Sequence, residues 1–287
     1  MTASLRGFYW RLTDAGTGRV AVALCGVCPG WALVGLAVHP GGWWRSRIVD
    51  DPHVDDRGVR VGTAFAADAR HVRLDLGPGC RLEAEVIGAD RWPRAWNGLG
   101  PGGWLPGLAQ YWRPDPLRAR VTGAVEAAER WSLHGWSGYA ERNWGPAFPS
   151  RWWWGEAHDF GGDPVTVAFA GGPAFGPLEA TAVVVRLDGR LVRLGEPVLA
   201  GVSASVEPGS WRLRGRSLRH GVEVEAAADP AAAHVLDVPL PDERRVEPWS
   251  HQHLAGGLRV RVTRRGRTVY AGQTDMAGLE LGRGTGR

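Results

Sequence analysis

Apolar and polar residues alternate with a period of two along most of the chain. Between residues 70 and 86, Val72, Leu74 and Leu76 alternate with charged residues, and the pattern resumes after a Gly-Pro-Gly turn. Side chains of a β-strand point to its two faces in turn, so this pattern predicts antiparallel strands that are buried on one face. The same pattern recurs in residues 183–194, 210–226 and 258–272.

Short turn signals separate these strands, and helical periodicity is almost absent. The pair Asp188-Gly189 between two alternating runs is a strong sequence signal for a hairpin. Only residues 230–234 and 104–112 favour a turn of helix each. The pattern therefore predicts an all-β protein with little helix.

The longest uncharged stretch, residues 20–38, matches a membrane-spanning helix in length. Pro29 and Gly30 stand at its midpoint, however, and valine recurs throughout, so two buried strands joined by a tight turn fit better. The N-terminus also lacks the basic and then apolar layout of a signal peptide. We therefore expect a cytoplasmic protein that is at most peripheral to a membrane.

A stretch rich in Trp, Pro and Gly, residues 91–116, interrupts the series of strands. Such a composition is typical of a long connector, and we predict an N-terminal domain of residues 1–118 and a C-terminal domain of residues 119–287. About eight to ten candidate strands in each part are enough to hide the sheet edges in a closed barrel. The expected fold class is all-β, with two antiparallel lipocalin-like β-barrels that are each wide enough for an apolar ligand.

Composition and charge narrow the expected partners. Hydrophobic residues make up 44% of the chain and charged residues 22%, as in globular proteins. The net charge is only +4, and the arginines, which replace lysine throughout, alternate along strands instead of forming runs. This charge is too weak and too dispersed for nucleic acid. The expected partner is an apolar small molecule, with a weak attraction to an anionic membrane surface.

Metal-binding patterns are incomplete. Cys25 and Cys28 form a C-x-x-C, but there is no second pair, and residues three apart on a strand face opposite sides. We therefore predict that both are small buried side chains. His251 and His253 share a strand face without an evident third ligand. The sequence predicts neither a metal nor a cofactor.

Candidate chemistry gathers in residues 138–160, which include three consecutive tryptophans. If residues 151–160 form a strand, one of its faces carries Trp152, Trp154, Glu156 and His158. A carboxyl group against indole rings is poorly solvated, so its pKa rises and it can act as an acid near neutral pH. Indole faces also stabilise a cation, by about 0.5–2 kcal/mol each. Taken alone, these residues favour a core or an inter-domain seam over the wall of a reaction cavity.

Just upstream, Tyr139, Glu141 and Asn143 also alternate. Glu141 either takes part in chemistry or pairs with Arg142, Arg151 or a backbone amide and fixes a loop. The residue pattern leaves both roles open.

Residues 138–154 resemble the signature of the tocopherol cyclase family, which reads approximately Tyr-Ser-Glu-Lys-Asn-Trp-Gly, then Phe-Pro, a basic residue and Trp-aromatic-Trp. Arg142 stands where the family usually has lysine. Residues 6–12 and 274–282 are similar to the terminal segments of the family, so the resemblance spans the chain. The matching positions are Gly7, Tyr9, Arg11, Tyr139, Glu141, Asn143, Trp144, Gly145, Phe148, Pro149, Arg151, Trp152, Trp154, Met276, Ala277, Glu280 and Gly282.

The resemblance implies a pair of lipocalin-like barrels and a metal-free, cofactor-free cyclisation of a prenylated hydroquinone to a chromanol. Glu141 or Glu156 would protonate the alkene, and Tyr139, Asn143 or His158 would orient the phenolic oxygen or accept its proton. The expected substrate contacts are Trp144, Trp152, Trp154, Phe148, Trp112 and Tyr111.

Other functions remain open besides cyclisation. Glu156 and His158 stand where the family tends to carry amides, which affects the identity of the substrate and the proton donor. The same acid with water as nucleophile would give a carotenoid 1,2-hydratase-type reaction. A non-enzymatic carrier of an apolar ligand would use the same barrels without turnover.

Overall fold

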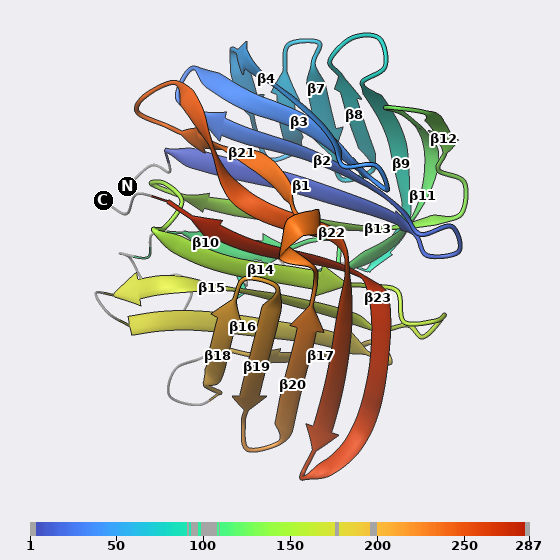
Figure 1. Ribbon diagram of the computed structural model, residues 1–287, viewed down its shortest axis with the longest axis vertical. Helices are drawn as coiled ribbons and strands as arrows, with labels where there is room; N and C mark the ends of the chain where they lie inside the picture. Colours follow the sequence, from blue (N-terminus) through green and yellow to red (C-terminus); the bar gives the residue numbers. More distant parts are fainter. Residues whose placement is uncertain are drawn as a thin grey trace. The chain divides into compact units, whose positions relative to one another are not determined.

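The computed structural model describes residues 4–90, 92, 97–98, 108, 110–175, 178–195 and 200–284. These residues are almost entirely in antiparallel strands (Figure 1). The helical turn expected at residues 230–234 is present as η2 (Pro230–Ala232), which Asp229 caps. Of the other expected turn, at residues 104–112, Tyr111 and Trp112 instead belong to a strand, β10 (Tyr111–Pro114). The rest of it is largely outside the described residues, as is most of the connector at 91–116.

The first sheet follows the order β4-β3-β2-β1-β13-β11-β9-β8-β7-β6-β5, and β12 pairs with β11 beside this path. Its strands are β1 (Leu5–Asp14), β2 (Arg19–Cys28), β3 (Trp31–His39), β4 (Trp43–Asp50), β5 (Pro52–Val54), β6 (Gly58–Val61), β7 (Phe65–Asp68), β8 (His71–Asp75), β9 (Arg81–Asp90), β11 (Arg118–Glu126), β12 (Arg130–Ser132) and β13 (Trp136–Gly145).

The second sheet follows the order β17-β16-β15-β14-β23-β22-β20-β19-β18. Its strands are β14 (Arg151–Ala157), β15 (Thr166–Phe175), β16 (Leu178–Leu187), β17 (Arg190–Leu194), β18 (Val202–Glu207), β19 (Ser210–Arg216), β20 (His220–Ala227), β22 (Arg245–Arg264) and β23 (Arg267–Arg283). The remaining strands are β10 (Tyr111–Pro114) and β21 (His234–Leu240).

In each sheet, the first and the last strand of the path come close to each other. The path of the first sheet starts at β4 and ends at β5, and Asp51 alone separates these strands in the chain. One intervening residue spans at most about 7 Å, so the two edges approach each other there. The second path starts at β17 and ends at β18, and the Gly195 amide donates to the Ala200 carbonyl at 2.7 Å between them. The predicted fold class, two antiparallel lipocalin-like barrels with little helix, is confirmed.

The chain divides into two interleaved units. The first comprises Met1–Trp92, Asp115–Ala147 and Leu236–Pro248, and the second comprises Pro93–Pro114, Phe148–Val235 and Trp249–Arg287. The boundary expected between residues 118 and 119 therefore falls inside the first unit. The physical reason is strand pairing: β13 pairs with β1 along almost its whole length, and β11 pairs with β9.

The turns predicted from the sequence are present. Asp188 and Gly189 connect β16 to β17, and both have the positive φ that a tight two-residue hairpin requires. Pro29 and Gly30 connect β2 to β3, so the uncharged stretch 20–38 forms two paired, buried strands. No helix among the described residues has the length and apolarity needed to cross a membrane.

The cysteines are free thiols in buried positions, as predicted for Cys25 and Cys28. Burial and the nearby Asp242 carboxylate raise the pKa of the Cys28 thiol to about 12. Within the part of the chain that the structure describes, no three His, Cys, Asp or Glu side chains are grouped as metal ligands would be.

Each unit has its own apolar core, and the core fixes which strand faces remain for other roles. In the first unit, Phe8 and Trp10 of β1 and Ala140 of β13 belong to the core. In the second unit, Trp153 and Ala157 of β14 do so. Alternation therefore turns the neighbours of these residues to the opposite face of each sheet, where polar side chains are also buried.

Candidate functional site

The polar layer of the first unit contains Tyr139 and Glu141. The Tyr139 hydroxyl donates a hydrogen bond of 2.7 Å to Glu141 Oε2. The residues are 1% and 6% exposed, so this hydrogen bond is shielded from water. Strand pairing places Arg11 opposite Tyr139 and Tyr9 opposite Glu141 on β1.

Arg11 contributes a buried positive charge to the same face. It is fully buried, and its Nη1 atom donates to Thr13 Oγ1 at 2.8 Å. Burial and the charge of Arg11 lower the pKa of His39 below its ordinary value. Arg142 instead lies with its guanidinium over the Phe8 ring, 5.3 Å from the centroid, on the core face of β13. Arg142 and Glu141, although adjacent in the signature, therefore lie on opposite faces of β13.

Asn143 lies on the same face of β13, and its side chain occupies the space that the missing side chain of Gly7 leaves open. The two residues are paired across β1 and β13, and a Cβ atom on Gly7 would come within 2.6 Å of Asn143 Cγ. Only glycine leaves room for the amide at this position. The N-terminal segment and the central signature, which both match the family, are thus in direct contact through Gly7 and Asn143.

The polar layer of the second unit contains Glu156 and His158. Glu156 Oε2 and His158 Nδ1 are 2.8 Å apart, and the residues are 0% and 1% exposed. A hydrogen bond between a carboxyl oxygen and an imidazole nitrogen requires one proton between them. The proton that the pair shares is therefore held away from bulk water. Both were predicted as site residues.

A second carboxyl group, Glu280, lies on the same sheet face, directly across from Trp154 on the paired strand β23. It accepts hydrogen bonds from Trp152 Nε1 at 2.6 Å, Ser250 Oγ at 2.9 Å and Gln252 Nε2 at 3.4 Å. Burial raises the pKa of Glu280, against the lowering effect of these three donors. Glu280 was not among the predicted site residues, although it is part of the C-terminal segment that matches the family.

The amide of Gln252 adds a further polar atom beside Glu280. Gln252 is 1% exposed, and its Oε1 atom has no hydrogen-bond partner among the described residues. If the amide is reversed, Oε1 faces Glu280 and accepts a hydrogen bond from the O–H of the neutral carboxylic acid. The geometry can therefore accommodate Glu280 in both protonation states.

The predicted aromatic contacts take different positions. Phe148 and Trp152 pack with ring centroids 4.8 Å apart, and the Trp152 indole lies over Gly282, where a Cβ atom would overlap it. Trp154 is buried beside them in the strand, whereas Trp153 points to the core and donates to Thr181. The remaining predicted contacts are partly buried on β13 and β10: Trp144, Tyr111 and Trp112.

The residues predicted as one site belong to both units. Tyr139, Glu141, Asn143 and Trp144 lie in the first, and the other predicted residues lie in the second. Within the units, the structure brings some of the predicted residues together in pairs: Tyr139 with Glu141, Glu156 with His158, and Phe148 with Trp152.

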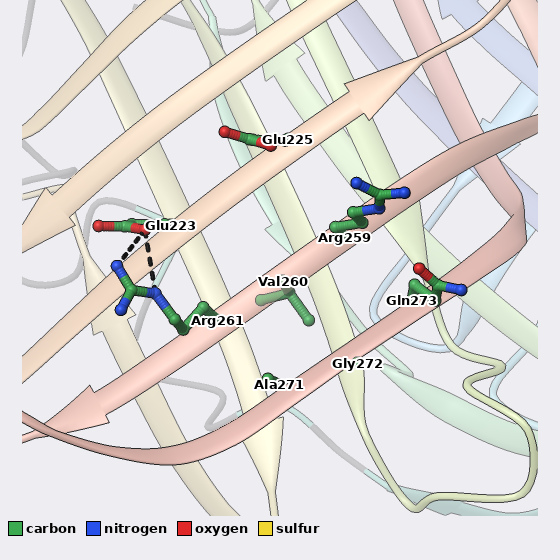
Figure 2. Close-up of a pocket in the computed structure, with 8 residues that line it drawn as sticks. All are labelled: Glu223, Glu225, Arg259, Val260, Arg261, Ala271, Gly272 and Gln273. Atoms are coloured by element: carbon green, nitrogen blue, oxygen red, sulfur yellow. Dashed lines mark hydrogen bonds and ion pairs between the residues drawn. The ribbon is translucent and has the colours of Figure 1, made fainter.

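A groove of about 440 Å³ lies on β20, β22 and β23 of the second unit (Figure 2). Glu223, Glu225, Arg259 and Arg261 line it, and Arg261 Nη2 and Glu223 Oε2 form an ion pair at 2.7 Å. Paired charges on an outward face do not suit an apolar ligand. The groove is therefore separate from the candidate site on β14 and β23.

Comparisons with known proteins show which family the chain is similar to. The tocopherol cyclase-like family model matches residues 118–283, more than half of the chain. The chain is 29% identical over 201 residues to the probable chloroplastic tocopherol cyclase of Oryza sativa subsp. japonica, covering 63% of this chain. It is 26% identical over 204 residues to the chloroplastic tocopherol cyclase of Zea mays, covering 65% of this chain. These alignments span only 42% of each relative.

Solved structures show the same fold at low identity. Kievitone hydratase from Nectria haematococca superposes with a TM-score of 0.61 and 12% identity, covering 99% of this chain and 90% of that one. A putative AttH from Nitrosomonas europaea gives 0.54 and 12%, covering 99% and 94%. The matched family region contains Glu141, Glu156 and Glu280 together with the strands that position them. The chain belongs to the tocopherol cyclase-like family.

Proposed function

We propose that the protein catalyses the proton-initiated cyclisation of a prenylated hydroquinone to a chromanol without a cofactor. A proton adds to the nearest trisubstituted double bond, and the tertiary carbocation forms a C–O bond with the phenolic oxygen. That oxygen then releases its proton, so product and substrate have the same composition. The reaction needs one acid that later recovers a proton, and walls that exclude water.

The observation that carries this proposal is the buried Glu156–His158 pair. Its single shared proton lies at the end of a strand that also carries Trp152 and Trp154 on the same face. The pair can give this proton to the alkene and recover one from the phenol, which closes the proton balance. Indole faces beside it stabilise the carbocation, by about 0.5–2 kcal/mol each. Membership of the family supports the same reaction class.

Two other groups have distinct roles in the proposal. Glu280 is a positioning residue, because it holds the Trp152 indole through the 2.6 Å hydrogen bond. The Tyr139–Glu141 pair of the first unit is the second candidate for the acid, since its hydroxyl and carboxyl group are also buried and hydrogen-bonded. Substitution of each pair separately tells the two candidates apart.

The test is turnover of a prenyl quinol in the absence of any added cofactor. Purified protein is incubated with phytyl- or geranylgeranyl-benzoquinol. The products are separated by chromatography, and their masses are determined by mass spectrometry. A chromanol of unchanged mass is the expected product, and in D2O it should carry one non-exchangeable deuterium at the protonated carbon.

Other outcomes would contradict cyclisation. A product heavier by one water identifies a hydratase. Saturable binding of the quinol without any product identifies a carrier. The Glu156→Gln variant is the matched control, because it keeps the shape of the side chain and removes its ability to act as an acid.

A further inference from the structure

Two hairpin turns of the second unit lie side by side, at the lower end of Figure 1. One connects β19 to β20 through Ser217–Arg219, and the other connects β22 to β23 through Arg265 and Gly266. His220 is paired with Arg264, and the Arg265 amide donates to the Arg219 carbonyl at 2.8 Å. The backbone therefore fixes the two turns against each other.

This pair of turns is strongly basic. Residues 216–220 and 264–269 contain no Asp or Glu. Burial, Arg264 and Arg219 together lower the pKa of His220, which reflects the local positive field. The turns carry five exposed arginines: Arg216, Arg219, Arg264, Arg265 and Arg267.

The positive charge is confined to the turns. Farther along the same strands, arginines stand opposite acidic residues, as in the Arg261–Glu223 ion pair of Figure 2. Arg212 and Arg214 of β19 are likewise paired in register with Glu225 and Glu223 of β20. The sheet surface thus carries acidic residues next to its arginines, whereas the turns carry none.

An exposed apolar side chain, Leu218, lies among these arginines. Leu218 is 98% exposed, the highest value among the large hydrophobic residues that the structure describes, and Val269 nearby is 50% exposed. Exposure of a leucine side chain to water is unfavourable, whereas insertion into a lipid interface removes its apolar surface from water and lowers the free energy.

We propose that these two turns form a docking surface for an anionic lipid bilayer. The arginines bind headgroup phosphates, for which guanidinium geometry is well suited, and Leu218 inserts between the lipids. The exposed leucine favours a bilayer over nucleic acid, which offers it no apolar environment. The surface is independent of the proposed cyclisation, although a prenyl quinol would itself be dissolved in the bilayer.

Vesicle flotation tests this proposal. Vesicles of phosphatidylcholine alone are compared with vesicles in which about a third of the lipid is phosphatidylglycerol, at low and high salt. The protein should float with the anionic vesicles only, and less at high salt, because exposed charges are screened. Each arginine near the surface contributes roughly fivefold to partitioning, so Arg219→Gln with Arg265→Gln should reduce it more than tenfold. Leu218→Ser should reduce it severalfold and leave the salt dependence in place.

The matched control is Arg212→Gln with Arg214→Gln, which removes the same charge from β19 at positions opposite acidic residues. It should float like the wild type. Equal losses in both double variants, or no flotation of the wild type at low salt, would overturn the proposal. A short RNA duplex that displaces the protein from vesicles, with no effect of Leu218→Ser, would assign the surface to nucleic acid instead. Turnover of a quinol in detergent micelles does not depend on any of these outcomes.

Discussion

Asn143 lies directly over Gly7 on the paired strand, with no room for a Cβ atom between them. The Gly7→Ala variant must therefore displace the amide or the strand. We expect a loss of about 1–3 kcal/mol in the free energy of unfolding, as for overpacked sites. Chemical denaturation of Gly7→Ala, Asn143→Ala and the double variant checks this. The double variant should recover much of the loss, and strict additivity would contradict the steric explanation.

Tyr139→Phe should destabilise the first unit, because it removes the donor to buried Glu141. Leaving a buried acceptor without its partner costs about 1–3 kcal/mol, and more for a charged group. The measurement is the unfolding free energy of Tyr139→Phe, Glu141→Gln and the combined variant. A coupling energy near zero would show that the 2.7 Å bond contributes little to stability.

Glu156→Gln should abolish most turnover while the protein stays folded. General acid catalysis contributes about a hundredfold to ten-thousandfold, and the amide has no comparable proton to give. Single-turnover kinetics on a prenyl quinol measure the effect. Glu207→Gln, at an exposed position of β18, is the control and should react at the wild-type rate. If the rate instead falls in Glu141→Gln and not in Glu156→Gln, the acid belongs to the first unit.

Glu280 should make stability depend on pH. Its pKa is raised above the ordinary 4.5, so the folded state retains a proton that the unfolded state has released. The free energy of unfolding should therefore fall as pH rises from about 4.5 through the folded-state pKa, and level off above it. Urea denaturation across this range should show the slope in the wild type. The slope should be smaller in Glu280→Gln, and an unchanged slope would assign it to another group.

Much of the strand structure could be predicted from the sequence, because it depends on local chemistry. The Asp188-Gly189 turn specifies its own φ values, and period-two alternation placed Trp152, Trp154 and Glu156 on one face. The opposite position of Trp153, in the core, follows from the same period.

The long-range pairings could not be predicted in this way. Nothing local indicates that β13 pairs with β1 or β11 with β9, and these pairings place β11, β12 and β13 in the first unit. Glu280 was missed for the same reason, because it meets Trp152 only through the pairing of β23 with β14. Its signal was the isolated acidic residue in the C-terminal segment that resembles the family.

The interleaving of the units limits how the gene can be divided. The first unit needs the segment Leu236–Pro248, which is synthesised after most of the second unit. The first unit therefore lacks one of its segments until residue 248 has been synthesised. No single cut of the chain separates the two units, so neither unit can be exchanged by a simple fusion at one position.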